Sequence, residues 1–581
     1  MTLFRVWAPV AATVEVQVAG ERHPMSRHDG GWWAADVDIV RDADYGFSVD
    51  GREVLPDPRS AWQPHGVHAL SRVVDHAQFE WQTSTWHGRP VLGQVVYELH
   101  VGTFTEAGTF DAAIEHLDHL VDLGVDFVEL LPIAAFPGRY GWGYDGVFLS
   151  AVHQPYGGPD ALKRFVDGCH ARGLGVVLDV VYNHLGPDGN VLAAYGPYFT
   201  DSYATPWGDA VNYSGPESDE VRRFAVDNAI MWLRDYRIDA LRLDAVHEII
   251  DTSAVHLLEE LATDIAALSE QVGRPLSLIA ETDLNDPRLV TAREAGGYGL
   301  DAQWNDDFHH ALHTVVTGES FGYYEDFGSM AQLGTAMTRG YVYAGEYSVH
   351  RRRRHGRPLP GSIIGHQLLG YAQDHDQIGN RAAGDRLSSL ISPSLAKVTA
   401  ALVLTGPFTP MLFMGEEWGA STPWQYFTDH EDEELAESVR TGRRGEFRAF
   451  GWNDEDVPDP QHPATMHRSV LQWDEVGTQP HADMLAWHRE LIALRRALPD
   501  LRDGRFDQLR VDIDEPRRLL VLHRPSSVVA ANLSRVQHTI DIDASSLLLA
   551  SPDVDLLGSR LTLPPESVAI LARRRVPSPR A

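Results

Sequence analysis

From residue 94 onward, short and almost purely apolar runs alternate with longer amphipathic stretches. Strands that are buried on both faces of a parallel sheet appear as such Val-, Ile- and Leu-rich runs, and the intervening helices make the crossovers. Eight repeats of this unit predict an α/β fold, a (β/α)8 TIM barrel. The strand candidates are QVVYELHVG, DFVELLPI, LGVVLDVVYNH, IDALRLDAV, LSLIAETD, LDAQWNDD, LLGYAQDHD and PMLFMGEEW.

The intervening stretches carry apolar residues three and four positions apart, as amphipathic helices do. Thr109, Ser253 and Ser392 precede three of them and are expected to act as N-caps. The clearest helix candidates are TFDAAIEHLDHLVDLG, PDALKRFVDGCHARG, DEVRRFAVDNAIMWLRDY, SAVHLLEELATDIAAL, PSLAKVTAALVLTG and MLAWHRELIALRRAL.

The two ends of the chain show a different rhythm. Apolar and polar residues alternate there in short runs. These runs are FRVWAP, TVEVQVAG and WWAADVDI near the start, and LRVDI, RLLVLHR, SVVAANL and HTIDIDA near the end. This pattern is typical of antiparallel strands with one buried face. We therefore predict an N-terminal β-sandwich at 1–88, resembling a carbohydrate-binding domain, a catalytic barrel with loop insertions at 89–500, and a C-terminal antiparallel β domain at 501–581.

The charge of the chain restricts its partners. A formal net charge of -33 disfavours nucleic acid, because phosphate contacts need clustered cations. The basic run at 351–354 is better explained as a solvated or acid-paired loop. No stretch approaches the roughly 20 apolar residues that span a bilayer, and the start lacks a signal-peptide pattern. We expect no membrane partner and a cytoplasmic protein, and the single Cys169 reads as a buried thiol.

Three carboxylates follow three of the predicted strands: Asp244, Glu281 and Asp376. Catalytic groups of β/α barrels lie at the carboxyl ends of the strands, so these acids are expected to meet in one pocket. Arg242 lies two residues before Asp244, and therefore on the same side of its strand. Such a guanidinium favours the ionised form of a neighbouring carboxyl.

A pair of carboxyl groups is what a retaining glycosidase needs. One attacks the anomeric carbon, and the other stays protonated and gives its proton to the leaving oxygen. Asp244 suits the first role, and Glu281, after the apolar residues 278–280, suits the second because desolvation raises a carboxyl pKa. Asp376 would bind sugar hydroxyls. Since buried Asp–Arg pairs also occur in purely structural networks, the evidence is the ordered series of clusters.

Four of these clusters, DVVYNH, ALRLDAVH, LIAETD and DHDQIGN, resemble the α-amylase family of glycoside hydrolases. The resemblance extends over nearly the whole chain. It implies that Asp244 is the nucleophile, Glu281 the proton donor and Asp376 the transition-state stabiliser. It also implies supporting or sugar-binding roles for further residues, which are Arg242, His184, His375, Tyr144, Asp179 and His247.

Two positions depart from common patterns of that family. Asp374 stands where many members have Asn, which would add negative charge near Asp376, and His247 stands where digestive amylases have Lys. Longer strings, among them YELHVGTFTEAGTF, FMGEEW, QYFTDHEDEEL and RRGEFRAFGW, are similar to one branch of the family. That similarity implies hydrolysis of the α-1,4 bond between a maltooligosaccharide and a terminal trehalose. Candidate contacts for the trehalose end are Trp207, Trp304, Asp306, Trp424 and Tyr426.

Three other functions remain open at this level. A glucan branching enzyme would transfer the glycosyl group to a sugar, a general α-amylase would cut plain glucans, and a catalytically silent protein would only bind them. The complete acid series argues against the silent protein. The resemblance implies the small oligosaccharide maltooligosyltrehalose as the partner and no cofactor. We predict no metal site, because zinc-type ligand spacing is missing, although a calcium site built from scattered oxygens would leave no sequence pattern. The sequence assigns no oligomeric state.

Overall fold

A computed structural model describes residues 2–38, 43–448 and 457–574. Its centre is a closed barrel of eight parallel strands in chain order, which confirms the predicted fold class. All eight barrel strands coincide with the apolar runs of the sequence. They are β9 (Val96–Leu99), β10 (Phe127–Leu130), β13 (Gly175–Val180), β16 (Ala240–Leu243), β17 (Ser277–Ala280), β18 (Ala302–Trp304), β21 (Leu368–Gly370) and β22 (Thr409–Phe413).

The barrel interior is packed with side chains. Val96, Val177, Ile279, Leu369 and Met411 come from five different strands and belong to one buried cluster. Branched side chains fill the interior of such barrels in layers, so the barrel is a core and not a pore. The acids of the predicted site follow the carboxyl ends of β16, β17 and β21.

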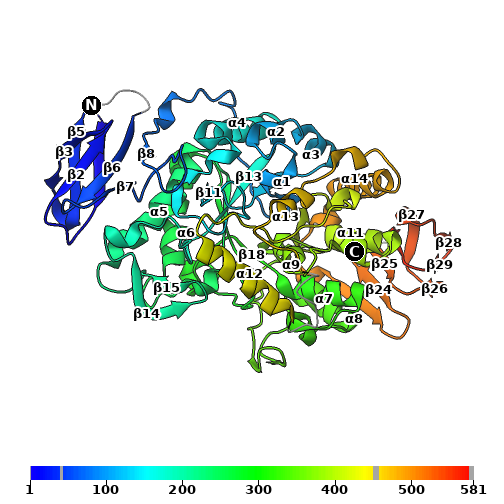
Figure 1. Cartoon of the computed structure of the whole chain (residues 1–581). Coiled ribbons are helices and arrows are strands. Elements are labelled where there is room, and N and C mark those ends of the chain that lie inside the picture. The colour runs from blue at the N-terminus through cyan, green and yellow to red at the C-terminus, as the bar shows by residue number, and fades with distance from the viewer. Residues whose placement is uncertain (1, 39–42, 449–456, 575–581) are drawn as a thin grey trace.

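The helices surround this barrel (Figure 1). Thr109 and Ser392 accept hydrogen bonds from Ala112 N and Leu395 N, as predicted for N-caps. The main helices are α1 (Val101–Phe104), α2 (Phe110–Ile114), α3 (Leu117–Leu123), α4 (Gly158–Ala171), α5 (Ser218–Asp235), α6 (Leu257–Val272), α7 (Asp306–Thr317), α8 (Met330–Arg339), α9 (His375–Gly379), α10 (Leu387–Leu390), α11 (Pro393–Thr405), α12 (Glu433–Arg448), α13 (Pro463–Arg468) and α14 (His481–Ala497).

Two helix predictions were wrong in detail. Ser253 is not an N-cap, because α6 begins at Leu257 with His256 as its cap. The Asp251 carboxylate accepts hydrogen bonds from the backbone amides of Ser253 and Leu257. The long helix predicted after Thr109 is divided into α2 and α3, and His116 at the break stacks on Trp473 with ring centroids 3.9 Å apart. A contact with a residue distant in sequence thus coincides with the interruption of a continuous helical pattern.

Antiparallel sheets lie at both ends of the molecule, the N-terminal ones on the left of Figure 1 and the C-terminal ones on the right. They agree with the predicted β domains in type, whereas the boundaries at 88/89 and 500/501 remain predictions. The N-terminal strands are β1 (Thr2–Trp7), β2 (Val14–Val18), β3 (Glu21–Pro24), β4 (Ser26–Arg27), β5 (Trp32–Val37), β6 (Asp44–Val49), β7 (Val54–Leu55) and β8 (Ser71–Arg72). The C-terminal strands are β23 (Arg510–Asp514), β24 (Leu519–His523), β25 (Ser527–Asn532), β26 (His538–Asp541), β27 (Ala544–Ser551), β28 (Asp555–Leu557), β29 (Arg560–Leu563) and β30 (Ser567–Arg573).

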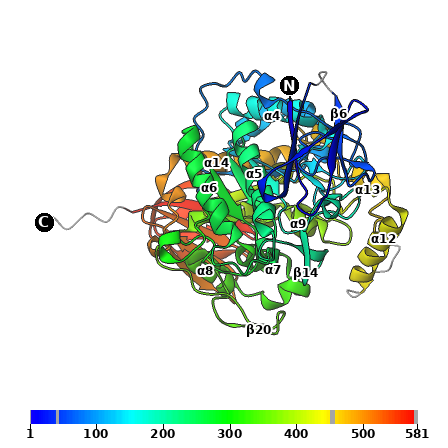
Figure 2. The same ribbon diagram turned by 90° about the vertical axis from the view of Figure 1, so that its left-hand side faces the viewer.

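Three short antiparallel strand pairs and the helix α12 belong to the segments between the barrel strands or after the last of them. The pairs are β11 (Ala134–Ala135) with β12 (Phe148–Val152), β14 (Phe199–Thr205) with β15 (Gly208–Val211), and β19 (Tyr347–Ser348) with β20 (Arg353–Arg354). Figure 2 shows α12 at one edge of the molecule. The acidic run at 431–434 is exposed and Cys169 is fully buried, as expected.

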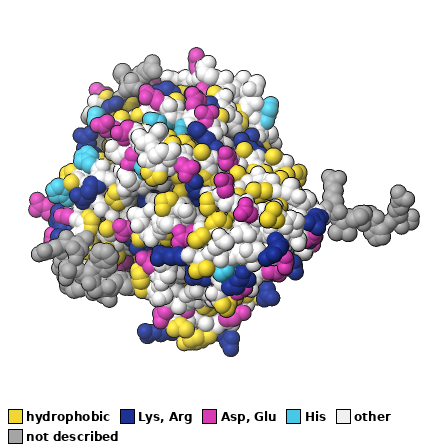
Figure 3. Space-filling model, turned by 90° about the vertical axis from the view of Figure 1, so that its right-hand side faces the viewer, with side chains coloured by type: hydrophobic (Ala, Val, Ile, Leu, Met, Phe, Trp, Pro, Cys, Tyr) yellow, Lys and Arg dark blue, Asp and Glu magenta, His cyan; other side chains and the backbone are white. Residues whose placement is uncertain are grey.

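The surface carries charged side chains of both signs, as the counts of acidic and basic residues in the sequence lead one to expect. On the face drawn in Figure 3, acidic and basic side chains are interspersed, with apolar atoms scattered between them. Within the described ranges, no helix has both the length and the apolar character needed to cross a membrane.

Candidate active site

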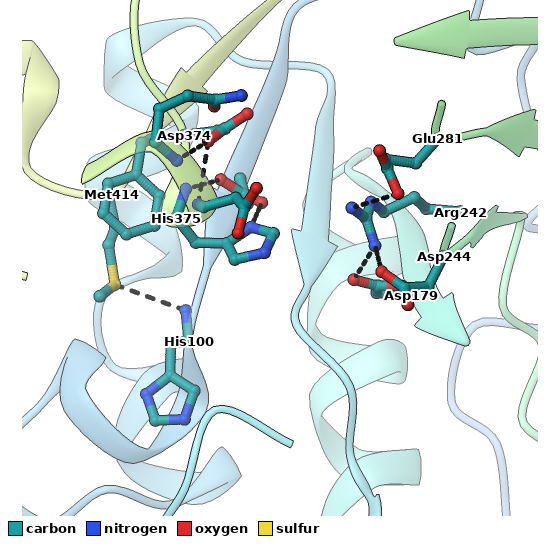
Figure 4. Close-up of polar contacts among 12 residues, drawn as sticks. His100, Asp179, Arg242, Asp244, Glu281, Asp374, His375 and Met414 are labelled. Atoms are coloured by element: carbon teal, nitrogen blue, oxygen red, sulfur yellow. Dashed lines mark hydrogen bonds and ion pairs between the residues drawn. The ribbon is translucent and has the colours of Figure 1, made fainter. Parts of the chain in front are cut away.

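Arg242 is the centre of the acidic cluster, on the right of Figure 4. Its Nη1 donates to Asp179 Oδ2 at 2.6 Å and to Asp244 Oδ1 at 2.9 Å, and its Nη2 lies 3.7 Å from Glu281 Oε2. The guanidinium is buried, which lowers its pKa, but Asp179 and other acidic neighbours raise it well above the ordinary value. One fixed positive charge therefore joins the two carboxyl groups that were predicted to act together.

Glu281 is the member of the pair that favours the protonated form. Burial raises its pKa well above the usual carboxyl range, and the Asp244 and Asp306 charges raise it further, against the lowering effect of Arg242. Its Oε2 accepts a hydrogen bond of 2.7 Å from Ala245 N. Ala245 has a φ of 38°, in the left-handed region, and such strained residues concentrate at functional sites.

Tyr144, Asp179 and His375 form the floor next to Arg242. The Tyr144 hydroxyl donates to Asp179 Oδ2 at 2.6 Å and lies 2.8 Å from His375 Nε2, and the two rings stack. Burial raises the pKa of Asp179 to about 6, although Arg242 opposes this shift. The sequence placed these residues on three separate segments, and the fold brings them into one hydrogen-bonded group.

His375 is held from below by Glu98 on β9. Glu98 Oε1 lies 2.5 Å from His375 Nδ1, and Glu98 Oε2 accepts from the His375 amide at 3.0 Å. Burial lowers the pKa of His375, but Glu98 reverses this and the result is about 9. This shift favours the protonated ring, whose Nδ1 faces Glu98 and whose Nε2 can donate to the Tyr144 hydroxyl.

Asp374 differs from its expected role. Its carboxyl is fully buried, caps α9 by accepting from Asp376 N and Gln377 N, and has a pKa raised well above the usual value by burial and by Glu98. The neutral form is favoured, so Asp374 does not add the full negative charge near Asp376 that the sequence suggested. Its function in the structure is to cap the short helix that carries His375 and Asp376.

A cavity of about 360 Å³ opens beside this cluster. Volumes of roughly 300–1,000 Å³ are typical of small-ligand sites. Asp376 is exposed toward solvent and lines the cavity with Tyr144, His184, Trp207 and Tyr426. Trp207, on the turn between β14 and β15, is 49% exposed and stacks on His184 with ring centroids 4.1 Å apart. An exposed aromatic ring of this kind can stack on the apolar face of a sugar.

Four further predicted contacts lie outside the cavity lining, as do the cluster residues Asp244, Glu281, Arg242, Asp179 and His375. Trp304 is buried beneath Arg242, with the guanidinium 4.3 Å from its ring centroid, and Trp424 is buried and donates to the His375 carbonyl. Asp306 accepts a hydrogen bond from the Tyr371 hydroxyl, and burial raises its pKa to about 7. His247 is partly exposed beside Glu248. Of these four, the two tryptophans support residues of the site from behind.

Sequence reasoning missed several residues that build the cavity. Trp142 stacks on Trp424, and Arg443 of α12 donates to Asn380 Oδ1 at 3.0 Å and lies over the Tyr426 ring. Asn380 in turn donates to Asp376 Oδ1 at 2.7 Å. Arg443 lies in the string RRGEFRAFGW, which signalled the branch of the family but no position in the site; residues 449–456 are outside the described ranges.

Replacing Arg443 by alanine is expected to lower kcat/KM roughly tenfold to hundredfold, because misplacing a catalytic group costs rates of this size. The side chain is mostly buried and connects α12 to Asn380, and through it to Asp376. Arg440→Ala on the same helix is the matched control, because within the described residues its ion pairs are with Glu437 and Asp459. Steady-state kinetics and circular dichroism of both variants would test this; equal activities would contradict it.

The basic run at 351–354 is acid-paired at its first residue and exposed over the rest. Arg351 makes an ion pair of 2.5 Å with Asp283, two residues beyond Glu281, whereas 352–354 are exposed. The acid-paired loop predicted from the sequence is thus confirmed for Arg351. Among the described residues, no three His, Cys, Asp or Glu side chains are grouped so as to hold a metal ion.

Three comparisons place this architecture among known proteins. The family model for the alpha amylase catalytic domain matches residues 83–201. In solved structures, a putative alpha amylase from Salmonella typhimurium superimposes with a TM-score of 0.90 at 37% identity, covering 98% of this chain and 97% of that one. A pullulanase from Paenibacillus barengoltzii, solved with maltohexaose and alpha-cyclodextrin, shares the fold with a TM-score of 0.72 at 20% identity, covering 99% of this chain and 94% of that one.

Curated relatives are similar over nearly their whole length. The malto-oligosyltrehalose trehalohydrolase of Arthrobacter ramosus is 55% identical, covering 90% of this chain and 91% of the relative. That of Mycobacterium tuberculosis is 53% identical, covering 98% and 99%. A 1,4-alpha-glucan branching enzyme from Pseudoalteromonas atlantica is only 28% identical, over 73% of this chain and 62% of the enzyme. The chain belongs to the malto-oligosyltrehalose trehalohydrolase family of α-amylase-type glycoside hydrolases.

Proposed function

We propose that this protein is a retaining glycosidase that hydrolyses the α-1,4 bond between a maltooligosaccharide and a terminal trehalose unit, with release of trehalose. The observation that carries the proposal is the near-full-length identity of 53–55% to proteins named for this activity. The arrangement of Asp244 and Glu281 around Arg242 supports the mechanism. The branching-enzyme alternative rests on a far more distant relative.

In the first step Glu281 gives its proton to the glycosidic oxygen as the bond to the anomeric carbon breaks. Asp244 Oδ2, the oxygen of that carboxylate not bonded to Arg242 Nη1, bonds to this carbon, and trehalose leaves with the proton. Arg242 orients Asp244 during the attack. The raised pKa of Glu281 supplies the protonated form that this step requires.

In the second step a water molecule attacks the same carbon, Glu281 takes its proton, and the bond to Asp244 breaks. The enzyme returns to its starting state and the glucan is released with retained configuration. We assign to Asp376 the binding of sugar hydroxyls near the oxocarbenium-like transition state, since its exposed carboxylate is oriented by Asn380 in the cavity. Tyr144, His184 and His375 would surround the sugar at the cleavage site, and Trp207 and Tyr426 would contact a neighbouring unit.

The proposal is tested by a matched comparison of two substrates. The purified protein is incubated with maltooligosyltrehalose and with a maltooligosaccharide of equal length, and free trehalose and shortened glucans are quantified. We expect trehalose release to exceed cutting of the plain oligosaccharide strongly. Equal cutting of both would indicate a general amylase, and new α-1,6 linkages without free trehalose would indicate a branching enzyme.

A further inference from the structure

A second cavity, of about 530 Å³, lies at the opposite end of the barrel from the acids. Val95, Asp126 and Leu174 line it and directly precede β9, β10 and β13, so it opens at the amino ends of these strands. The helices α3 and α14, which pack against each other at the upper right of Figure 1, contribute to its wall. A six-residue strand such as β13 separates this end from the predicted catalytic end by about 20 Å at ~3.3 Å per residue.

The lining of this cavity is strongly basic. Arg89, Arg172, Arg495, Arg496 and Arg502 all contribute, and Asp126 is the single acidic residue of the lining. Such a concentration of guanidinium groups stands out in a chain whose formal net charge is -33.

Carboxylates compensate only part of this charge. Asp126 accepts from both Arg89 and Arg496 at 2.9 Å, and Arg172 pairs with Asp118 outside the lining. Two carboxylates thus stand against five guanidinium groups. Within the described residues, the guanidinium of Arg502 makes no ion pair, and its residue is exposed.

Arg495 is a buried positive charge without a carboxylate ion-pair partner among the described residues. It is 1% exposed, its Nη1 and Nη2 donate to backbone carbonyls, among them Leu404, Leu501 and Phe408, and its Nε has no partner in the described structure. Burial, together with the nearby charges of Arg524 and Arg502, lowers its pKa to about 9 against the opposing charge of Asp126. A buried cation without a carboxylate partner is costly, and a bound anion would relieve that cost.

We propose that this cavity binds a small phosphate-bearing molecule. Guanidinium groups match phosphate oxygens with paired hydrogen bonds, and the volume falls in the range of small-ligand sites and exceeds what a bare phosphate needs. Sugar phosphates and nucleotides share this chemistry. Because the site lies across the barrel from the predicted catalytic acids, it is separate from the oligosaccharide cleft, and the proposal does not depend on the proposed function.

The test is calorimetric titration of the full chain at fixed ionic strength with glucose 6-phosphate, AMP, glucose and adenosine. We expect at least one phosphorylated probe to bind with a Kd below ~1 mM and its unphosphorylated counterpart to show no binding. The probe that binds distinguishes a sugar phosphate from a nucleotide. No heat from either phosphorylated probe would overturn the proposal.

Two variants locate the binding. Arg502→Gln removes an exposed guanidinium from the lining, and Val121→Glu, at a side chain 40% exposed in the wall, adds a negative charge. Each is expected to weaken binding roughly tenfold, the effect of one charged hydrogen bond, while oligosaccharide turnover is unchanged. Arg510→Gln on β23, which removes an exposed ion pair with Asp512, is the matched control and should bind as the parent does. Equal affinity in all three variants would mean an adventitious anion contact and would overturn the proposal.

Discussion

Asp244→Asn is expected to lower kcat by at least ~10⁴-fold, because an amide cannot form the glycosyl-enzyme bond; at 1.36 kcal/mol for each factor of ten this is about 5.5 kcal/mol of lost transition-state stabilisation. The amide oxygen can still accept the hydrogen bond from Arg242 Nη1, which is 2.9 Å in the parent. The fold should therefore survive. Turnover of maltooligosyltrehalose and the thermal midpoint of both proteins provide the measurement.

The matched control for this variant is Asp264→Asn on α6. Asp264 also accepts from an arginine, Arg223, at 2.8 Å, but on a helix outside the barrel. It should retain parent-like turnover. Parent-like activity in Asp244→Asn would remove this residue from the role of nucleophile, whereas loss of activity in both variants would indicate that the removal of any Asp–Arg pair disturbs the protein.

Glu281→Gln should lower kcat/KM for maltooligosyltrehalose by roughly 10²- to 10⁴-fold, the usual contribution of general acid catalysis. The pH profile gives the sharper result. Because burial raises the pKa of Glu281, the parent should lose kcat/KM as the pH rises through that pKa and the proton donor ionises. The variant has no proton to lose at this position, so its residual rate should lack this alkaline limb.

A substrate that needs no protonation separates this role from a structural one. A maltooligosyl fluoride should still transfer its glycosyl group to Asp244 in Glu281→Gln, and azide, which needs no general base, should speed release of the intermediate. Glu270→Gln, at an exposed position at the end of α6, is the control and should behave as the parent does. An unchanged alkaline limb in Glu281→Gln would assign proton donation to another group.

The barrel was predictable because its strands are short and buried on both faces, so hydrophobic runs and loop positions sufficed to identify all eight. The helix caps at Thr109 and Ser392 were also predictable from local chemistry. The prediction failed at Ser253, where Asp251 binds the amides instead, and at His116, where stacking on Trp473 coincides with the break between α2 and α3. Both failures depend on a competing partner that propensity does not include.

The same division applies to the candidate site. The meeting of Asp244 and Glu281 around Arg242 follows from strand order, since neighbouring parallel strands end at one edge. The positions of the aromatic residues do not follow from it. Trp304 and Trp424 were expected to contact sugar but are buried supports, and Trp207 is the exposed one. Composition cannot distinguish a tryptophan in the core from one that lines a cavity, because the packing of the folded chain determines whether a ring face is exposed to solvent.

By itself the sequence determined the barrel, the order of the acids along it and the branch of the family, because hydrophobic period and motif spacing are local properties. Only the tertiary structure decided which residues surround these acids. It placed Glu98 under His375, buried Asp374 so that its neutral form is favoured, and brought Arg443 of α12 to Asn380. It also gathered five arginines from distant segments at the far end of the barrel. Burial and electrostatic coupling arise between residues far apart in the chain, and they exist only once the chain has folded.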